Sequence, residues 1–221
     1  MVEDKKILTF ELKPNRIETL SDGVFAIVMT LLVLDLTVPQ VNIKMVDTVD
    51  IQLLKAFSTM WPIYLSYAVS FLVLGIYWFF HHFQFHYIKR SDGIFAWLNI
   101  FFLMSVTFIP FSTKLLGLLH IYSIIAIVIY GINNFIIILF SNFIWWYAVH
   151  RNRLVDADLS PKIIKHIRIR LIILATAFPV SIALSYANRY LGIAIYAVFI
   201  IAGIIVNVLS SRINLVKHQH H

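Results

Sequence analysis

Long apolar segments recur along the whole chain and are separated by short polar connections. Six of them stand out, at about residues 20–38, 60–83, 94–116, 121–148, 169–186 and 190–209. Each has enough residues to cross a hydrocarbon layer of about 30 Å as an α-helix. None shows the polar-apolar alternation of a transmembrane β-strand. The pattern predicts an all-α integral membrane protein, a single domain over residues 1–221 with six transmembrane helices.

The composition supports a membrane protein and excludes several other classes. The chain is 60% hydrophobic and only 13% charged, whereas soluble domains carry about 25% charged residues. The net charge is +7, but the basic residues lie between apolar segments, so a topology signal explains them better than nucleic-acid binding. The absence of cysteine excludes disulfides and thiolate metal sites. The polar first 19 residues give no sign of a cleavable signal peptide.

Lysine and arginine residues are unevenly divided between the two sets of connections. Fourteen lie in the N-terminal arm, the links after the second and fourth segments, and the C-terminal tail, and four lie in the other links. Basic residues favour the cytoplasmic side of a membrane. The bias predicts cytoplasmic N and C termini, in agreement with an even number of spans.

The first apolar segment belongs to the stretch RIETLSDGVFAIVMTLLVLDL, from Arg16 to Leu36. At about 100° per residue, one stripe of this helix carries Ile27, Thr30, Leu31 and Leu34. Because nearly every position here is apolar, the periodicity alone leaves open whether the stripe faces a pore, other helices or lipid.

The polar start of this stretch needs partners. Asp22 lies just inside the span, where an unpaired carboxylate is costly, and Arg16 is beyond the i,i+4 distance from it. The second span ends, and the third begins, at the same depth. Candidate partners there are His81, His82 and Asn99. We expect these residues, with Arg16, Ser21 and Asp22, to form a hydrogen-bond network that holds the first helix. A simpler alternative is that Ser21 and Asp22 cap the helix N-terminus.

These residues resemble a known family. The first helix of the transmembrane-protein-175 family of potassium channels, found in prokaryotes and lysosomes, opens with Arg-x-x-x-Phe-Ser-Asp. That signature stands here as Arg16, Leu20, Ser21 and Asp22, with leucine replacing phenylalanine. YWFFHHFQFHYIKRSD and AWLNIFFLMSVTFIPFSTKLLG also look like the prokaryotic branch, so the resemblance covers roughly the first 120 residues.

The resemblance implies a homotetramer whose central pore is lined by the first helix of each chain. The family's constriction positions fall on Ile27, Thr30 or Leu31, and Leu34, the stripe found above. The sequence has no Thr-Val-Gly-Tyr-Gly filter. We therefore expect a leak-type, potassium-permeable channel in which a neck of Ile27 side chains gates by dewetting and Thr30 hydroxyls replace some of the water of K⁺. Partners are other copies of the chain, the lipid bilayer and K⁺, and we expect no cofactor and no metal site.

Several interpretations of the remaining polar residues stay open at this stage. Asp35 either attracts cations at the outer mouth or is a solvated carboxylate at a helix end. Asn133, Asn134 and Asn142 would line a path in a secondary transporter or proton-conducting channel, or they bridge helices. His81 and His82 would allow pH sensitivity. An enzyme is disfavoured because no His-x-x-x-His or Glu-x-x-His spacing lies within one of the expected spans and acidic residues are few. The bare six-span form points to a prokaryotic plasma membrane.

Overall fold

The described part of the chain is helical. The computed structural model describes residues 13–40, 48–119, 123–188, 191–192 and 198. Its elements are α1 (Pro14–Leu34), α2 (Val49–Tyr87), α3 (Gly93–Thr107), α4 (Ile109–Leu119), α5 (Ile124–Val149), the 3-10 helix η2 (His150–Asn152) and α6 (Pro161–Ala187). Within these residues the only β-structure is one isolated bridge, between Ile88 and Val155. The all-α fold class is confirmed.

Five candidate membrane spans are long and apolar enough to cross a bilayer, with α3 and α4 together counting as one span. They correspond to the first five segments expected from the sequence, so the protein is a multi-pass integral membrane protein. The sixth expected segment, 190–209, lies almost wholly outside the described residues. Six helices and the positions of the termini therefore stay predictions.

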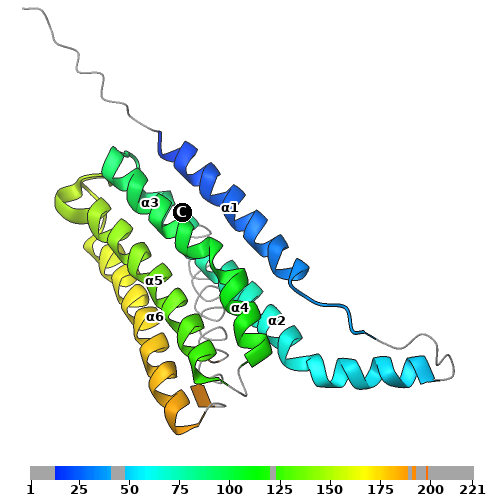
Figure 1. Cartoon of the computed structure of the whole chain (residues 1–221). Coiled ribbons are helices and arrows are strands. Elements are labelled where there is room, and N and C mark those ends of the chain that lie inside the picture. The colour runs from blue at the N-terminus through cyan, green and yellow to red at the C-terminus, as the bar shows by residue number, and fades with distance from the viewer. Residues whose placement is uncertain (1–12, 41–47, 120–122, 189–190, 193–197, 199–221) are drawn as a thin grey trace, which may run out of the picture.

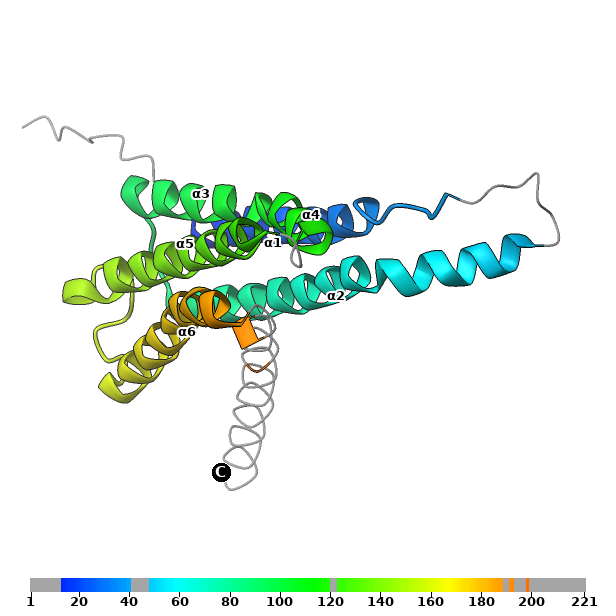
Figure 2. The same ribbon diagram turned by 60° about the horizontal axis from the view of Figure 1, so that its bottom comes forward.

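The helices form a bundle with α1 at one edge and α6 at the opposite edge (Figure 1). Helix α1 packs against α2, α3 and α4, whereas α5 packs against α3, α4 and α6. Figure 2 shows α2 running along the bundle and extending beyond it at its N-terminal end. This arrangement leaves one side of α1 without a neighbour among the helices that the structure describes.

The third expected span, 94–116, is a broken helix in the structure. Helix α3 ends at Thr107, Phe108 is its C-cap, and α4 starts at Ile109. Pro110 explains the break, because it has no backbone N–H to donate to the carbonyl four residues earlier and its ring clashes with that carbonyl. The expected span is present as Gly93–Leu119, with an interruption of the helix beside its proline.

The first two helices also differ in length from the expected spans. Helix α1 begins at Pro14, a favoured first position in a helix, and ends at Leu34 rather than near residue 38, shortly before Pro39 biases the chain towards extended structure. Helix α2 has 39 residues and a length of about 58 Å, roughly twice the hydrocarbon thickness. The helix is therefore longer than a span requires, and its N-terminal turns lie beyond the other helices (Figure 2).

Two links meet at the end of the bundle that carries most basic residues. The bridge between Ile88 and Val155 joins the α2–α3 link to the α5–α6 link. The Arg90 guanidinium donates to the Val155 carbonyl at 2.8 Å. Asp92 caps the N-terminus of α3 and accepts a hydrogen bond from the Tyr147 hydroxyl at 2.8 Å. These contacts fix α2, α3 and α5 relative to one another.

Candidate pore helix and its anchoring contacts

One face of α1 is buried and the other is uncovered. Phe25, Val28 and Leu32 are each 1% exposed and pack into the main apolar core. On the other face, Ile27 is 60% exposed and Leu34 is 77% exposed. The buried and the exposed residues each recur with the 3.6-residue period of an α-helix, so each set lies on its own side of α1. The stripe singled out from the sequence is thus the side of α1 that the single chain leaves open.

Thr30 and Leu31 lie on the same open side. The Thr30 hydroxyl donates to the carbonyl of Ile27 at 2.7 Å. A hydroxyl oxygen that donates its proton keeps lone pairs that can accept a hydrogen bond or coordinate a cation. Thr30 therefore presents an acceptor oxygen between rows of aliphatic side chains.

A buried chain of hydrogen bonds anchors the opposite side of α1 to α2 and α3. Asn99 on α3 donates from Nδ2 to the Ser21 hydroxyl at 3.0 Å. The Ser21 hydroxyl lies 2.9 Å from the carbonyl of Ile17, one turn earlier in α1. Asn99 Oδ1 lies 2.9 Å from Nε2 of His81 on α2, so this bond requires the proton on Nε2. The structure thus brings together Ser21, His81 and Asn99 as the sequence analysis expected.

The His81 ring is also held by aromatic packing. It is stacked on Phe102 of α3 with ring centroids 5.1 Å apart and on Phe85 of its own helix at 4.4 Å. His81 is only 1% exposed. The imidazole is thus fixed by a hydrogen bond at Nε2 and by the stacked rings. His81 therefore links α2 rigidly to α3 and is not a pore-lining group.

A second set of contacts lies nearer the surface. Trp78 on α2 donates from its indole Nε1 to the Asp22 carboxylate at 2.8 Å, and His82 Nδ1 lies 2.9 Å from the Glu18 carboxylate. The Trp78 and His82 rings are themselves stacked. Asp22 is therefore partnered from another helix, two turns inside α1, and the alternative of an N-terminal cap is wrong because α1 starts at Pro14.

Sequence reasoning missed Glu18 and Trp78. Each lies four residues before a residue that it did single out, Asp22 and His82 respectively, and so shares its helix face. Because α1 and α2 run in opposite directions, the earlier residue of one pair meets the later residue of the other. The i,i+4 spacing in both helices was the available signal.

Arg16 is exposed, and within the described residues its side chain makes no hydrogen bond or ion pair. The structure does not bring it to Asp22 or to the histidines. Asp35, at the other end of α1, forms an ion pair with Lys114 of α4 at 3.0 Å. The charge of Asp35 is thus partly neutralised. Neither interpretation of Asp35 from the sequence included this ion pair.

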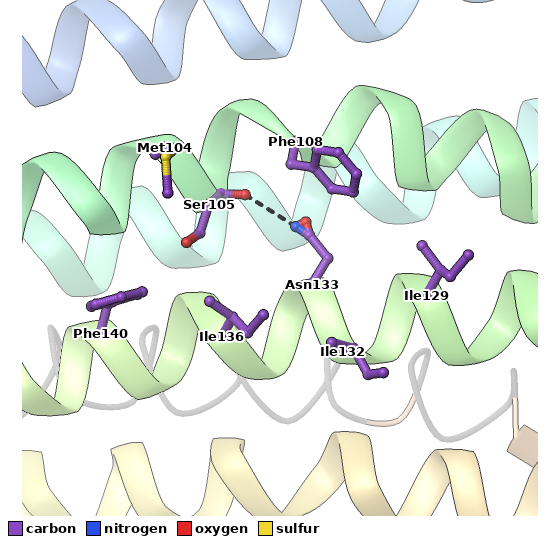
Figure 3. Close-up of a pocket in the computed structure, with 8 residues that line it drawn as sticks. All are labelled: Met104, Ser105, Phe108, Ile129, Ile132, Asn133, Ile136 and Phe140. Atoms are coloured by element: carbon purple, nitrogen blue, oxygen red, sulfur yellow. Dashed lines mark hydrogen bonds between the residues drawn. The ribbon is translucent and has the colours of Figure 1, made fainter.

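The asparagines of α5 bridge helices or bond to α5 itself. Asn133 donates from Nδ2 to the Ser105 carbonyl of α3 at 3.0 Å, and Figure 3 shows it between Ser105 and Phe108, beside an apolar cavity of about 420 Å³. Asn134 accepts from the Tyr77 hydroxyl of α2 at 2.8 Å. Asn142 bonds to a carbonyl of its own helix. These bonds are typical of helix packing in membranes and give no support to a polar transport path. Within the described residues, no group of three or more His, Asp or Glu side chains is placed to hold a metal ion.

These features define a class: a multi-pass helical membrane protein whose first helix is anchored on one side and presents an apolar, hydroxyl-bearing stripe on the other. Comparisons with known proteins identify the family within this class. The family model described as "Endosomal/lysosomal potassium channel TMEM175" matches residues 16–110. A Streptomyces collinus protein named a potassium channel is 32% identical over 183 residues, which are 81% of this chain and 86% of the relative. The chain belongs to the TMEM175 family, which is a family of ion channels and not of enzymes.

A solved structure and a vertebrate relative extend the comparison. The crystal structure of a lysosomal potassium-selective channel TMEM175 homolog from Chamaesiphon minutus superposes with a TM-score of 0.75 at 30% identity, and the match covers 87% of this chain and 96% of that chain. A Gallus gallus relative, named an endosomal/lysosomal proton channel, is 37% identical over 111 residues, but the match covers only 22% of that protein.

Proposed function

We propose that this protein is a leak-type, potassium-permeable channel in which α1 from each of four chains lines a central pore. The open stripe of α1 carries the proposal, since Ile27, Leu31 and Leu34 are 60%, 42% and 77% exposed while the opposite face is fixed by buried hydrogen bonds. Membership of the TMEM175 family and the relatives named potassium channels support the choice of ion.

The side chains of the stripe suggest how conduction is controlled. Four Ile27 side chains around an axis form a narrow apolar neck, and such necks exclude water until they widen. One turn further along, the Thr30 hydroxyls replace part of the hydration shell of the ion. K⁺ holds this shell less tightly than Na⁺, so a neck that strips water favours K⁺ modestly, without a Thr-Val-Gly-Tyr-Gly filter. The ion pair with Lys114 partly neutralises the charge of Asp35 at the outer mouth of the pore.

Substitution of Ile27 tests the gate. Ile27→Asn places four amides in the neck, so water enters more readily, and we expect K⁺ flux from liposomes containing the purified protein to rise several-fold. Val33→Asn is the matched control, because Val33 is also exposed on α1, at 47%, but lies outside the stripe. Equal flux from the wild type and the Ile27 variant would contradict the gate.

The assembly has its own test. We propose a homotetramer with six spans per chain and both termini in the cytoplasm of a prokaryotic cell. The mass of the detergent-solubilised complex, measured by light scattering with the detergent subtracted, should equal four chains of 25.6 kDa. A monomer that still conducts K⁺ would contradict a pore on a shared axis.

A proton-conducting channel is the second candidate. It is supported by the name of the Gallus gallus relative and by the His82–Glu18 pair, in which the His82 side chain is 57% exposed on the surface of the single chain. A pH-sensitive dye inside the same liposomes separates the two candidates. Acidification driven by a proton gradient without added K⁺ would favour protons, whereas flux that follows the K⁺ gradient alone favours the first proposal. Saturable exchange of the two ions would indicate a secondary transporter.

A further inference from the structure

A second cavity, of about 360 Å³, lies between α5 and α6. It is closest to the end of the bundle that carries the basic links, because its α6 residues fall in the first half of that helix. Ile164, Arg168 and Ile172 follow one another at intervals of four and so line it from one face of α6. Trp146 and Val149 line it from α5. The volume is within the usual range for a ligand site, about 300–1,000 Å³.

Two side chains that line this groove, Trp145 and Arg168, carry hydrogen-bond donors for which the described residues supply no acceptor. Trp145 is 2% exposed, and no group in the described part of the chain accepts from its buried indole Nε1. No carboxylate of the described ranges forms an ion pair with Arg168. Both side chains are donors only. A ligand that satisfies them must therefore bring acceptor oxygens, and the guanidinium favours an anion.

The position of the donors relative to the apolar walls selects the kind of anion. Arg168 is seven residues beyond the first residue of α6, or about 10 Å along the helix axis, at the level expected for the boundary between headgroups and hydrocarbon. Ile172 lies one turn deeper. Trp145 and Trp146 belong to the aromatic residues that favour this boundary. The groove thus offers polar donors at the interface and an apolar surface below it, which matches a headgroup joined to an acyl chain.

The surrounding charge is strongly positive. The connection before α6 and the first turns of α6 carry six basic residues, Arg151, Arg153, Lys162, Lys165, Arg168 and Arg170, against two acidic ones, Asp156 and Asp158. Such clusters attract the anionic lipids of the cytoplasmic leaflet. The field repels a headgroup that carries its own cation, so it discriminates among phospholipids that share the same tails.

We propose that this groove binds one anionic phospholipid. Its phosphate accepts from the Arg168 guanidinium and the Trp145 indole, and part of one acyl chain lies along Ile164 and Ile172. The proposal requires insertion in a bilayer and does not depend on which ion the protein conducts. It gives the α5–α6 pair, which lies away from the pore helix, a binding role of its own.

Native mass spectrometry of the full-length protein in detergent tests this site. Dioleoyl phosphatidylglycerol and dioleoyl phosphatidylcholine are the two probes, because they differ only in the headgroup. We expect the wild type to hold phosphatidylglycerol at least about fivefold more tightly than phosphatidylcholine, as one well-placed cation accounts for. Arg168→Gln should remove most of this preference. Trp145→Phe should weaken binding two- to threefold, and Ile172→Trp, which fills the apolar part, should weaken both lipids.

Lys162→Gln is the matched control, since it removes the same charge from the same helix but Lys162 does not line the groove. An equal loss in the Lys162 and Arg168 variants would overturn the proposal in favour of diffuse attraction. Equal binding of the two lipids would also overturn it. If glycerol phosphate competed with the same affinity as the whole lipid, the groove would bind phosphate without an acyl chain. That result would also overturn the proposal of a lipid site. Arg168 is exposed, so its variant should fold even where the Trp145 variant does not.

Discussion

At the scale of single residues, Asn99 anchors α1 to the neighbouring helices. It is 0% exposed, and its amide donates to Ser21 on α1 and accepts from His81 on α2. Removing it leaves the buried His81 Nε2–H without its acceptor and leaves the Ser21 hydroxyl with only its bond to the Ile17 carbonyl. A buried donor without an acceptor is costly where no water can reach it. One side chain thus links three helices through two hydrogen bonds.

Replacing Asn99 with leucine should therefore lower the free energy of unfolding by about 1–2 kcal/mol. The change is measured by titration of the purified protein with a denaturing detergent, followed by tryptophan fluorescence. Thr107→Val is the control, because the Thr107 hydroxyl is exposed and bonds only to Met104 of its own helix. If both variants lose the same stability, the interhelical bonds are not what anchors α1.

At the scale of helices, the close approach of α4 to α2 depends on a glycine. A Cβ atom built on Gly117 would lie 3.1 Å from the Cα of Ile63. This is backbone rather than a flexible side chain, so a larger residue has to push the two helices apart. Small residues at such points are a general feature of helix packing in membranes. By contrast, a Cβ on Gly75 of α2 would meet no atom within 4 Å.

These two glycines should respond to substitution in opposite directions. Gly117→Val should destabilise the protein by about 1–3 kcal/mol through overpacking. Gly75→Ala should be neutral or stabilise it by up to about 1 kcal/mol, since alanine is the better helix former. Thermal unfolding in detergent, monitored by circular dichroism, measures both. A Gly117 variant as stable as the wild type would show that α2 and α4 separate without cost.

At the scale of the whole molecule, the distribution of charge predicts the orientation in the membrane. The links at residues 88–92 and 150–160 lie together through the Ile88–Val155 bridge. Each carries two lysine or arginine residues, and the first turns of α6 add four more. The start of α2 lies at the other end of the bundle (Figure 1). The positive-inside bias therefore predicts that the joined links lie in the cytoplasm and the start of α2 outside.

The absence of cysteine makes this orientation easy to test. Single cysteines replace Asp50, at the start of α2, and Asp158, in the link before α6, both exposed positions. In intact cells with the outer surface accessible, a membrane-impermeant maleimide should label Asp50→Cys at once and Asp158→Cys only after permeabilisation. The reverse pattern of labelling would invert the proposed topology.

The sequence by itself determined the class of the protein. Segment length and hydropathy are local properties, and they were enough to predict a helical membrane protein. The helical period placed Ile27 and Leu34 on one stripe, but only the resemblance of the first helix to a known family gave that stripe a role. The sequence also proposed that Ser21, His81 and Asn99 meet, because the direction of each span fixes the depth of its ends.

Only the tertiary structure decided which partner each of the aspartates has. Ser-Asp-Gly occurs twice, at 21–23 and 91–93, yet Asp22 accepts from Trp78 inside α1 while Asp92 caps α3. The same three letters take different roles because a cap depends on where a helix begins, and a contact between helices depends on their register. The Asp35–Lys114 pair and the unsatisfied Trp145 indole arise in the same way, from the packing of segments far apart in the chain.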